Sequence, residues 1–381
     1  MVPSNASEKN RRMLGAALWS LGVLVGGLLL LFLFVIAPLM DRGPSAIVSM
    51  FFASLLAFPA VLVYLWVPVL VDRYDPEPWW CLAMAFIWGA IPACGFSAVI
   101  NTAISSVGGA VAGAAGSTIA GAVISAPIFE EAFKGMAVLG MFWFLRREFD
   151  GVVDGVIYAT FAALGFAAVE NVVYYARSLQ SGGEVGLAVT FVMRGVLSPW
   201  GHPLYTSMTG LGVGIARETN KGWLKICAPI GGYCAAVFLH SLWNGSAFLS
   251  SAMDFPLFLV MLPLWFLFVA AFGAIVIALV VREGRIIRMF LQDEVLIGNL
   301  SQQEVDLVCS PLGRLKSSLA GRGKRGRRFI DAASRLALSK WHATRAMQGQ
   351  KRTISADFIA PLRQELQRLR HEMYHGGGGV R

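Results

Sequence analysis

Apolar stretches long enough to cross a lipid bilayer recur along this sequence, from the N-terminus to about Val281. A transmembrane helix needs about 20 consecutive, mainly apolar residues. Only 14% of the residues are charged, whereas about 25% is usual in soluble domains. The sequence therefore predicts an all-α, polytopic transmembrane helix bundle of about eight helices. The expected spans are Leu14–Met40, Ala46–Val71, Trp79–Ile104, Thr118–Leu145, Val152–Ala176, Val185–Ala216, Ile226–Ser250 and Leu257–Val281.

Basic residues gather before the first apolar run and in every second loop after it, as they do on the cytoplasmic side of membrane proteins. The alternate loops hold only Arg42 and Arg177. We therefore expect a multi-pass protein of the plasma (cell) membrane with both termini in the cytoplasm. The basic residues on that side are Lys9, Arg11, Arg12, Arg73, Arg146, Arg147, Arg217, Lys221 and Lys225.

The net charge is concentrated at the C-terminal end of the sequence. Residues 282–381 contain 19 basic and 9 acidic residues, a net charge of +10, while the whole chain carries +9. We expect a transmembrane domain at residues 1–281, with its core at 72–250, and a short, basic, helical cytoplasmic tail at 282–381. Directly after eight spans, such a tail favours anionic lipids as a partner, and nucleic acid is disfavoured.

Local patterns predict several further features. In the tail, a capping box at Ser301 opens a short helix, and residues 328–347 and 355–374 have helical spacing that favours a helical hairpin.

The prolines and tryptophans of Asp72–Trp80 predict a turn at the membrane interface. The stretch Ser105–Ser117 contains only Gly, Ala, Ser and Val. It predicts either a mobile external loop or a site of close helix approach.

Ionisable side chains at bilayer depth are costly, so each one needs a reason. The fourth run contains Glu130, Glu131 and Lys134. Glu130 and Lys134 are four residues apart, so they share a helix face and are able to pair. Glu131 lies about 100° around the helix and is expected to face elsewhere. Because one lysine leaves one carboxylate unneutralised, a functional site is favoured over a structural ion pair.

Polar residues also occur in the next three runs. The adjacent pair Glu170 and Asn171 could orient a water, bind a metal or hold a histidine, or form an interhelical hydrogen bond. His202 lies in a Pro- and Gly-rich stretch that predicts a broken helix, which membranes tolerate only where protein or water lines the break. His240 and Asn244 are four residues apart and share one helix face.

These polar groups are predicted to lie at one depth. At a rise of about 1.5 Å per residue, Glu130, Glu170, His202 and His240 lie about 22–28 Å from the nearest cytoplasmic markers. That level is in the outer half of a hydrocarbon core of about 30 Å. Independent structural ion pairs give no reason for a shared depth, so the sequence predicts a single site.

Carboxylate, imidazole and amide groups in a water-accessible membrane cavity suit the hydrolysis of an amide bond. Glu130 or Glu131 would act as the general base that deprotonates water. His202 would assist or protonate the leaving amine. His240 and Asn244 would donate hydrogen bonds to the developing oxyanion.

The same groups leave other readings open. His202 and His240, with Glu130 or Glu170, could hold Zn²⁺ with one open position, and no HExxH motif decides the matter. A proton-coupled transporter is the main alternative, but it predicts repeated halves, and the sequence has no repeat. A non-catalytic scaffold leaves the common depth unexplained.

Taken in chain order, these motifs resemble the PrsW family of intramembrane proteases, which is more distantly related to CAAX-type membrane proteases. The resemblance covers about Asp72 to Asn244. It rests on Glu130-Glu131-x-x-Lys134, Phe166-x-x-x-Glu170-Asn171, Arg194, Ser198-Pro199, Gly201-His202, His240-x-x-x-Asn244, the Asp75–Trp79 turn and Asp150-Gly151.

The resemblance implies a protease that cuts a membrane-anchored protein on the extracytoplasmic side, in the best-known relatives an anti-sigma factor. In the CAAX-type relatives a glutamate is thought to activate water, while histidine and asparagine form the oxyanion hole. Those relatives have histidine where this chain has Glu170, which leaves the role of Glu170 open. The PrsW family is often labelled a metalloprotease family, so a zinc-dependent mechanism is also implied.

Overall fold

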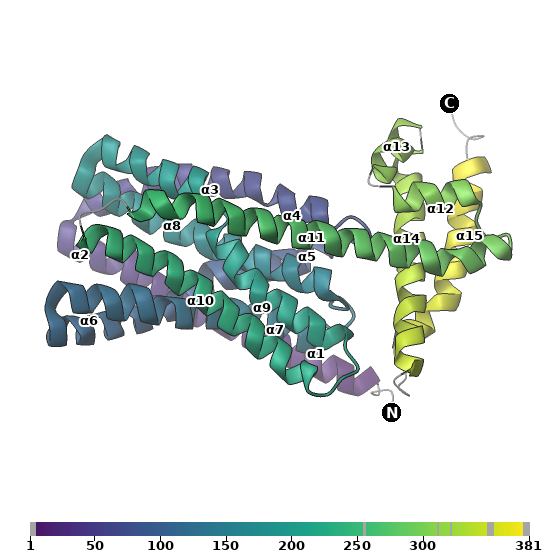
Figure 1. Cartoon of the computed structure of the whole chain (residues 1–381), viewed down its shortest axis with the longest axis horizontal. Coiled ribbons are helices and arrows are strands. Elements are labelled where there is room, and N and C mark those ends of the chain that lie inside the picture. Colours follow the sequence, from purple (N-terminus) through teal and green to yellow (C-terminus); the bar gives the residue numbers. More distant parts are fainter. Residues whose placement is uncertain (1–4, 254–256, 311, 321, 349–353, 376–381) are drawn as a thin grey trace. The chain divides into compact units, whose positions relative to one another are not determined.

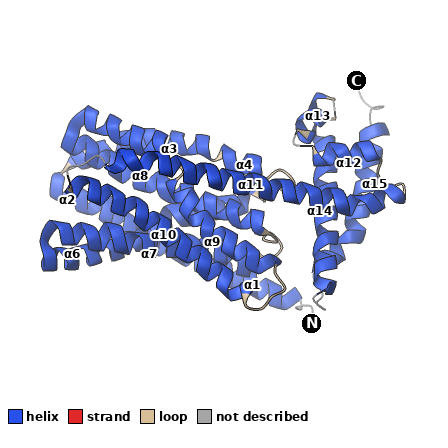
Figure 2. Ribbon diagram, in the orientation of Figure 1, coloured by secondary structure: helices blue, strands red, loops and turns tan. Residues whose placement is uncertain are grey.

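The computed structural model describes residues 5–253, 257–310, 312–320, 322–348 and 354–375. Helices and short loops make up these residues, so the predicted all-α fold is confirmed (Figure 2). By its contacts the chain divides into two compact units. The membrane bundle contains residues 5–71 and 77–274, and the tail unit contains residues 72–76 and the chain from 275 onward.

The helices of the membrane bundle (Figure 1) include several π-helical turns, which are named η here. In chain order they are α1 (Asn5–Leu31), η1 (Phe32–Ile36), α2 (Ala37–Arg42), α3 (Pro44–Tyr64), α4 (Trp66–Val71), α5 (Trp79–Trp88), η2 (Gly89–Ala93), α6 (Cys94–Thr118), η3 (Ile119–Ser125), α7 (Ala126–Phe144), α8 (Val152–Phe191), η4 (Val192–Leu197), α9 (Gly201–Glu218), α10 (Leu224–Ala252) and the beginning of α11 (Leu257–Leu296).

Among the described residues, 6 helical segments are long and apolar enough to cross a membrane. Two of them, Trp79–Phe144 and Val152–Glu218, contain 66 and 67 residues, about three times the length that one crossing needs. Each reverses direction within the helix, at Gly113 (φ 62°) and at Gly183 (φ 61°), because glycine adopts a positive φ without steric cost. We call them the first and second hairpin. Counting each hairpin as two passes gives the eight that the sequence predicts.

The arms of each hairpin lie in direct contact. In the first hairpin, the Ser105 hydroxyl donates to the Ser117 carbonyl at 3.0 Å, and a Cβ on Gly108 would lie 2.4 Å from the Gly116 carbonyl oxygen. The stretch Ser105–Ser117 is therefore a site of close helix approach, and the alternative of an external loop is wrong. Small side chains let the chain turn back without a polar loop.

Helix α8 forms the centre of the membrane bundle. In the most apolar stretch of the second hairpin, 89% of the residues are buried inside the protein. The corresponding share in the segment Glu8–Arg42 is 6%. Helix α8 packs against α3, α5 and α9. Its neighbours approach closely, since a Cβ on Gly89 would lie 1.8 Å from the carbonyl oxygen of Ala162. This packing holds the polar residues of α8 in the interior of the bundle.

The predicted breaks in the helices are confirmed. The second hairpin loses helical geometry at Ser198, where φ is −127°, and α9 begins at Gly201. The chain between Val71 and Trp79 is not helical, as its prolines predict.

The tail unit contains the end of α11 together with α12 (Gln302–Cys309), α13 (Gly313–Leu319), α14 (Gly323–Gln348), the 3₁₀ turn η5 (Ile354–Phe358) and α15 (Ile359–His375). The predicted capping box forms, because Ser301 Oγ accepts from the Glu304 amide and Glu304 Oε2 accepts from the Ser301 amide at 2.7 Å. Helices α14 and α15 pack together as the predicted hairpin.

A group of charged residues, the tail charge cluster, joins three helices of the tail unit. Lys340 Nζ contacts the carboxylates of Asp293 and Glu294 and donates to the Phe290 carbonyl at 2.9 Å. Arg363 Nε donates to Glu294 Oε1 at 2.8 Å. Glu294 is completely buried, and these contacts neutralise it.

Candidate functional site

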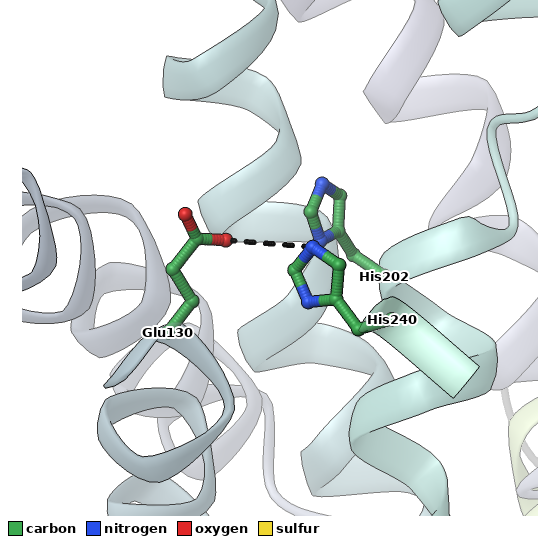
Figure 3. A group of neighbouring side chains, drawn as sticks. All are labelled: Glu130, His202 and His240. Carbon is green, nitrogen blue, oxygen red and sulfur yellow. Dashed lines mark ion pairs between the residues drawn. The ribbon is translucent and has the colours of Figure 1, made fainter. Parts of the chain in front are cut away.

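Polar side chains from α7, α8, α9 and α10 meet in the interior of the membrane bundle beside a cavity of about 540 Å³. The arms of both hairpins contribute to the cavity wall. The side chains at its centre are Glu130 on α7, His202 on α9 and His240 on α10 (Figure 3). The break before α9 allows His202 to lie at the beginning of a helix that points into the bundle.

Glu131 is the most completely paired of the carboxylates around this cavity. Its Oε1 accepts from Lys134 Nζ at 2.5 Å and from His240 Nδ1 at 3.0 Å. Its Oε2 accepts from the Thr206 hydroxyl at 2.8 Å. The side chains of Glu131 and Lys134 are both fully buried. Glu131 therefore ties α7 to α9 and α10, and it orients the ring of His240.

A chain of hydrogen bonds extends from Lys134 towards the second hairpin. Lys134 Nζ lies 3.1 Å from His202 Nδ1, and His202 Nε2 lies 2.7 Å from Glu170 Oε2. An ammonium group only donates, so His202 Nδ1 accepts and His202 Nε2 donates to Glu170. Glu170 also accepts from Arg194 Nη2 at 2.5 Å, and Arg194 Nε donates to Asn171 Oδ1 at 2.8 Å. Both nitrogens of His202 are thus engaged.

Glu130 differs from these groups because one of its oxygens is left open. Its Oε1 accepts from Asn101 Nδ2 at 3.1 Å. Its Oε2 is buried and has no hydrogen-bond partner among the described residues. His240 Nε2 lies 4.0 Å from this oxygen (Figure 3). Since His240 Nδ1 donates to Glu131, Nε2 of the neutral ring presents a lone pair towards Glu130. One water that donates a hydrogen bond to each atom would fit a separation of this size.

Asn244 lines the same cavity, on the same helix as His240. Its Nδ2 donates to the Ala122 carbonyl at 2.8 Å, so one of its two amide hydrogens is engaged within the protein. Tyr205 stacks on the ring of His240 with 4.9 Å between the ring centres, which restricts the rotation of His240.

The structure brings the predicted residues of four helices together, and one predicted contact is wrong. Lys134 pairs with Glu131 rather than with Glu130. Both separations, three and four residues, place side chains side by side on a helix. In this position Lys134 Nζ also lies 4.5 Å from the centre of the Phe166 ring and 3.1 Å from His202 Nδ1, two contacts from other helices. Glu131 consequently faces the interior, and Glu130 faces the cavity.

Sequence reasoning missed three polar residues of the site. Thr206 binds Glu131, Asn101 binds Glu130, and the Ser125 hydroxyl donates to Asn101 Oδ1 at 2.7 Å. A signal was present for Asn101, because an amide in the middle of an apolar run also needs a partner. Threonine and serine give no such signal, since they can bond to their own helix.

The donors around the cavity fit a metal ion in part. One donor atom each from Glu130, His202 and His240 lie within 4.8 Å of one another, and Glu170 is outside this group. Three such donors with an open position are typical of catalytic zinc. The open Oε2 of Glu130 and the Nε2 of His240 suit this role. His202 would first have to exchange its contact with Lys134 or with Glu170.

Comparison with known families identifies a relationship for the central part of the chain. A family described as "PrsW family intramembrane metalloprotease" matches residues 77–284, more than half of the chain. The match begins at Glu77 and extends beyond Asn244, through much of α11. Helices α1 to α4 and most of the tail unit lie outside it.

Several curated proteins named "Protease PrsW" resemble the chain. The protein of Geobacillus kaustophilus is 28% identical over 201 residues, which is 51% of this chain and 80% of that protein. The protein of Oceanobacillus iheyensis is 30% identical over 126 residues, 31% of this chain and 54% of that protein. The protein of Halalkalibacterium halodurans is 31% identical over 141 residues, 36% of this chain and 59% of that protein. No solved structure matches the chain. These relationships do not favour the transporter alternative.

Proposed function

The chain belongs to the PrsW family of intramembrane proteases, and we propose that it cleaves a membrane-anchored protein with Glu130 as the base that activates water. The observation that carries this assignment is the open Oε2 of Glu130, buried beside the cavity and 4.0 Å from His240 Nε2. A general base must reach the water whose proton it takes, and Oε2 is the carboxylate atom placed to do so.

The neighbouring residues divide the remaining work. Glu131 is too fully paired to act as the base, and it holds His240 through Nδ1. As water attacks the peptide carbonyl, the proton passes to Glu130, which is placed to return it to the leaving amine. The second amide hydrogen of Asn244, which lines the cavity, is left to stabilise the developing oxyanion, while the lone pair of His240 Nε2 accepts from the attacking water. His202 is held by Lys134 and Glu170 and fixes the part of the cavity wall that it forms.

A zinc-dependent form of the same reaction uses the same residues. Glu130, His202 and His240 would hold the ion, and Zn²⁺ would lower the pKa of a bound water and polarise the peptide carbonyl. In either form Glu131 keeps the ring of His240 in place through Nδ1. Metal analysis of active protein distinguishes the two forms. Loss of cleavage on chelation, restored by Zn²⁺, would contradict the metal-free mechanism.

The substrate and the surroundings follow from the same assignment. We propose a protein with a single membrane anchor as substrate, of the anti-sigma-factor type, cut on the extracytoplasmic side of the plasma membrane. Both termini of this chain would then be cytoplasmic, as the basic loops predict. Basic residues around the beginning of α14 would attract anionic lipids. They are Arg322, Lys324, Arg325, Arg327 and Arg328.

The test combines substrate discovery with reconstitution. Membrane proteins that are shortened in cells with the wild-type protein, but intact in cells with Glu130→Gln, are candidate substrates. Synthetic single-span peptides with a fluorophore and a quencher on either side of the juxtamembrane segment then serve as probes in liposomes. We expect Glu130→Gln and His240→Ala to lower cleavage by about 10²-fold or more, and intact cleavage by both variants would refute the proposal.

A further inference from the structure

We propose that Asn101 and Ser125 are positioning residues that hold the Glu130 carboxylate in its reactive orientation. The inference rests on the proposed function, because it assigns a task to the two residues that support the proposed base. Neither residue belongs to the acidic and histidine motifs that resemble the PrsW family.

The hydrogen bonds define one orientation for each group. Ser125 Oγ donates to Asn101 Oδ1 at 2.7 Å, which turns the amide so that Nδ2 points the other way. Asn101 Nδ2 then donates to Glu130 Oε1 at 3.1 Å. With the amide reversed, two oxygens, Oδ1 and Oε1, would face each other. The ionised carboxylate of Glu130 only accepts, so it selects this amide orientation, and the Ser125 hydroxyl donates to Oδ1 and holds the amide in it.

These hydrogen bonds give the two carboxylate oxygens of Glu130 different environments. The last torsion of a glutamate side chain is broad, so an unsupported carboxylate turns readily about its own axis. A hydrogen bond to Oε1 fixes this turn and leaves Oε2 facing His240. Without Asn101, the carboxylate would spend part of its time with neither oxygen aimed at the water. Positioning of this kind raises the rate without strengthening substrate binding.

The location of the two residues supports this role. Asn101 is on α6, in the outgoing arm of the first hairpin, and it lines the cavity. Ser125 and Glu130 are on the returning arm, five residues apart, and Ser125 is 1% exposed. The reversal at Gly113 brings the two arms together, so one hairpin contains both the base and its support.

The experiment measures kcat and KM separately with the quenched single-span peptides described above. We expect Asn101→Ala to lower kcat by about 10- to 100-fold with KM within about 2-fold of wild type, as is usual when a supporting hydrogen bond to a reacting group is lost. Ser125→Ala should lower kcat by about 3- to 10-fold, because the amide remains but is free to turn. Ser54→Ala is the matched control, since Ser54 is on α3, does not line the cavity, and donates to the Met50 carbonyl of its own helix.

A double-mutant cycle separates positioning from a purely structural role. If Asn101 acts through Glu130, adding Asn101→Ala to Glu130→Gln should not reduce the residual cleavage further. A kcat of Asn101→Ala within about 2-fold of wild type would overturn the inference. The inference would also be overturned if Asn101→Ala lowered cleavage by the same factor in wild type and in Glu130→Gln. A loss of activity that parallels a loss of thermal stability, or that arises from KM, would overturn it as well. If Glu130→Gln itself retains full cleavage, the proposed function fails instead.

Discussion

Two clusters of buried charge in this protein differ in how completely they are paired. In the tail charge cluster, Glu294 accepts from Lys340 and Arg363 at Oε1 and from Asn299 at Oε2. In the membrane bundle, Glu130 is also buried, yet its Oε2 has no partner among the described residues. A buried polar atom without a partner costs free energy. The complete cluster is therefore explained by stability, while the incomplete one needs a function.

The same contrast occurs between adjacent residues. Glu131 accepts hydrogen bonds from three side chains, whereas Glu130 accepts one from Asn101. Helix geometry points the two side chains in different directions, one into the protein and the other towards the cavity. We therefore expect substitutions of fully paired residues to act mainly on stability, and substitutions of Glu130 to act mainly on activity.

The largest effect is expected for Glu130→Gln. Loss of a general base typically lowers the rate by about 10²- to 10⁴-fold. Glutamine can still accept from Asn101 and introduces no unpaired charge, so the thermal unfolding midpoint should change little. Peptide cleavage and thermal unfolding of the same preparation check both parts. Unfolding at a clearly lower temperature would show that Glu130 belongs with the structural residues.

Lys340→Met should have the opposite profile. It leaves Glu294 buried with one fewer cationic partner, and breaking a buried ion pair costs about 3–5 kcal/mol. Limited proteolysis should therefore cut the tail unit faster in this variant. Arg288→Met is the control, because Arg288 pairs with Asp306 at an exposed position, where an ion pair contributes little to stability. Equal proteolysis of the two variants would contradict the structural role of the cluster.

Glu131→Gln is expected to have an intermediate effect. The variant leaves the buried Lys134 without its carboxylate at 2.5 Å, at a cost of about 1–3 kcal/mol, while the amide retains part of the hydrogen bonding. Its unfolding midpoint should fall below that of Glu130→Gln in the same detergent. The reverse order would break the distinction drawn between the two neighbouring glutamates.

The smallest effect concerns Asp331 in the tail unit. Burial raises the pKa of this carboxyl above its ordinary value of 3.8, although Arg314 at 2.6 Å opposes the shift. The folded state thus holds the proton more tightly than the unfolded state. The resulting stabilisation is present at low pH and is lost as the pH rises above about 4 through the folded pKa. Because the side chain is 37% exposed, we expect less than about 1 kcal/mol. Unfolding of Asp331→Asn at pH 4 and 7 should lack this small dependence.

Much of the fold and the core of the site could be predicted from the sequence. Apolar length and loop charge predict the eight passes, and counting along the helices predicts one common depth for Glu130, Glu170, His202 and His240. The partner of Lys134 could not be predicted, because Glu130 and Glu131 are both near enough on the helix. The observed pairing places Lys134 beside Phe166 and His202, which come from other helices. Asn101 was missed because only ionisable groups were counted for depth.

The two hairpins have a consequence for how this protein enters the membrane. An isolated helix that carries an arginine pays about 2.5–3.5 kcal/mol to place it at the centre of the bilayer. Here Arg194 meets Glu170 and Asn171 on the opposite arm of its own hairpin, and Glu130 meets Asn101 in the same way. If each hairpin leaves the translocon as one unit, Arg194 and Oε1 of Glu130 reach the lipid with these partners in place. The reversals at Gly113 and Gly183 that bring the proposed site together would then also lower the cost of inserting its polar groups.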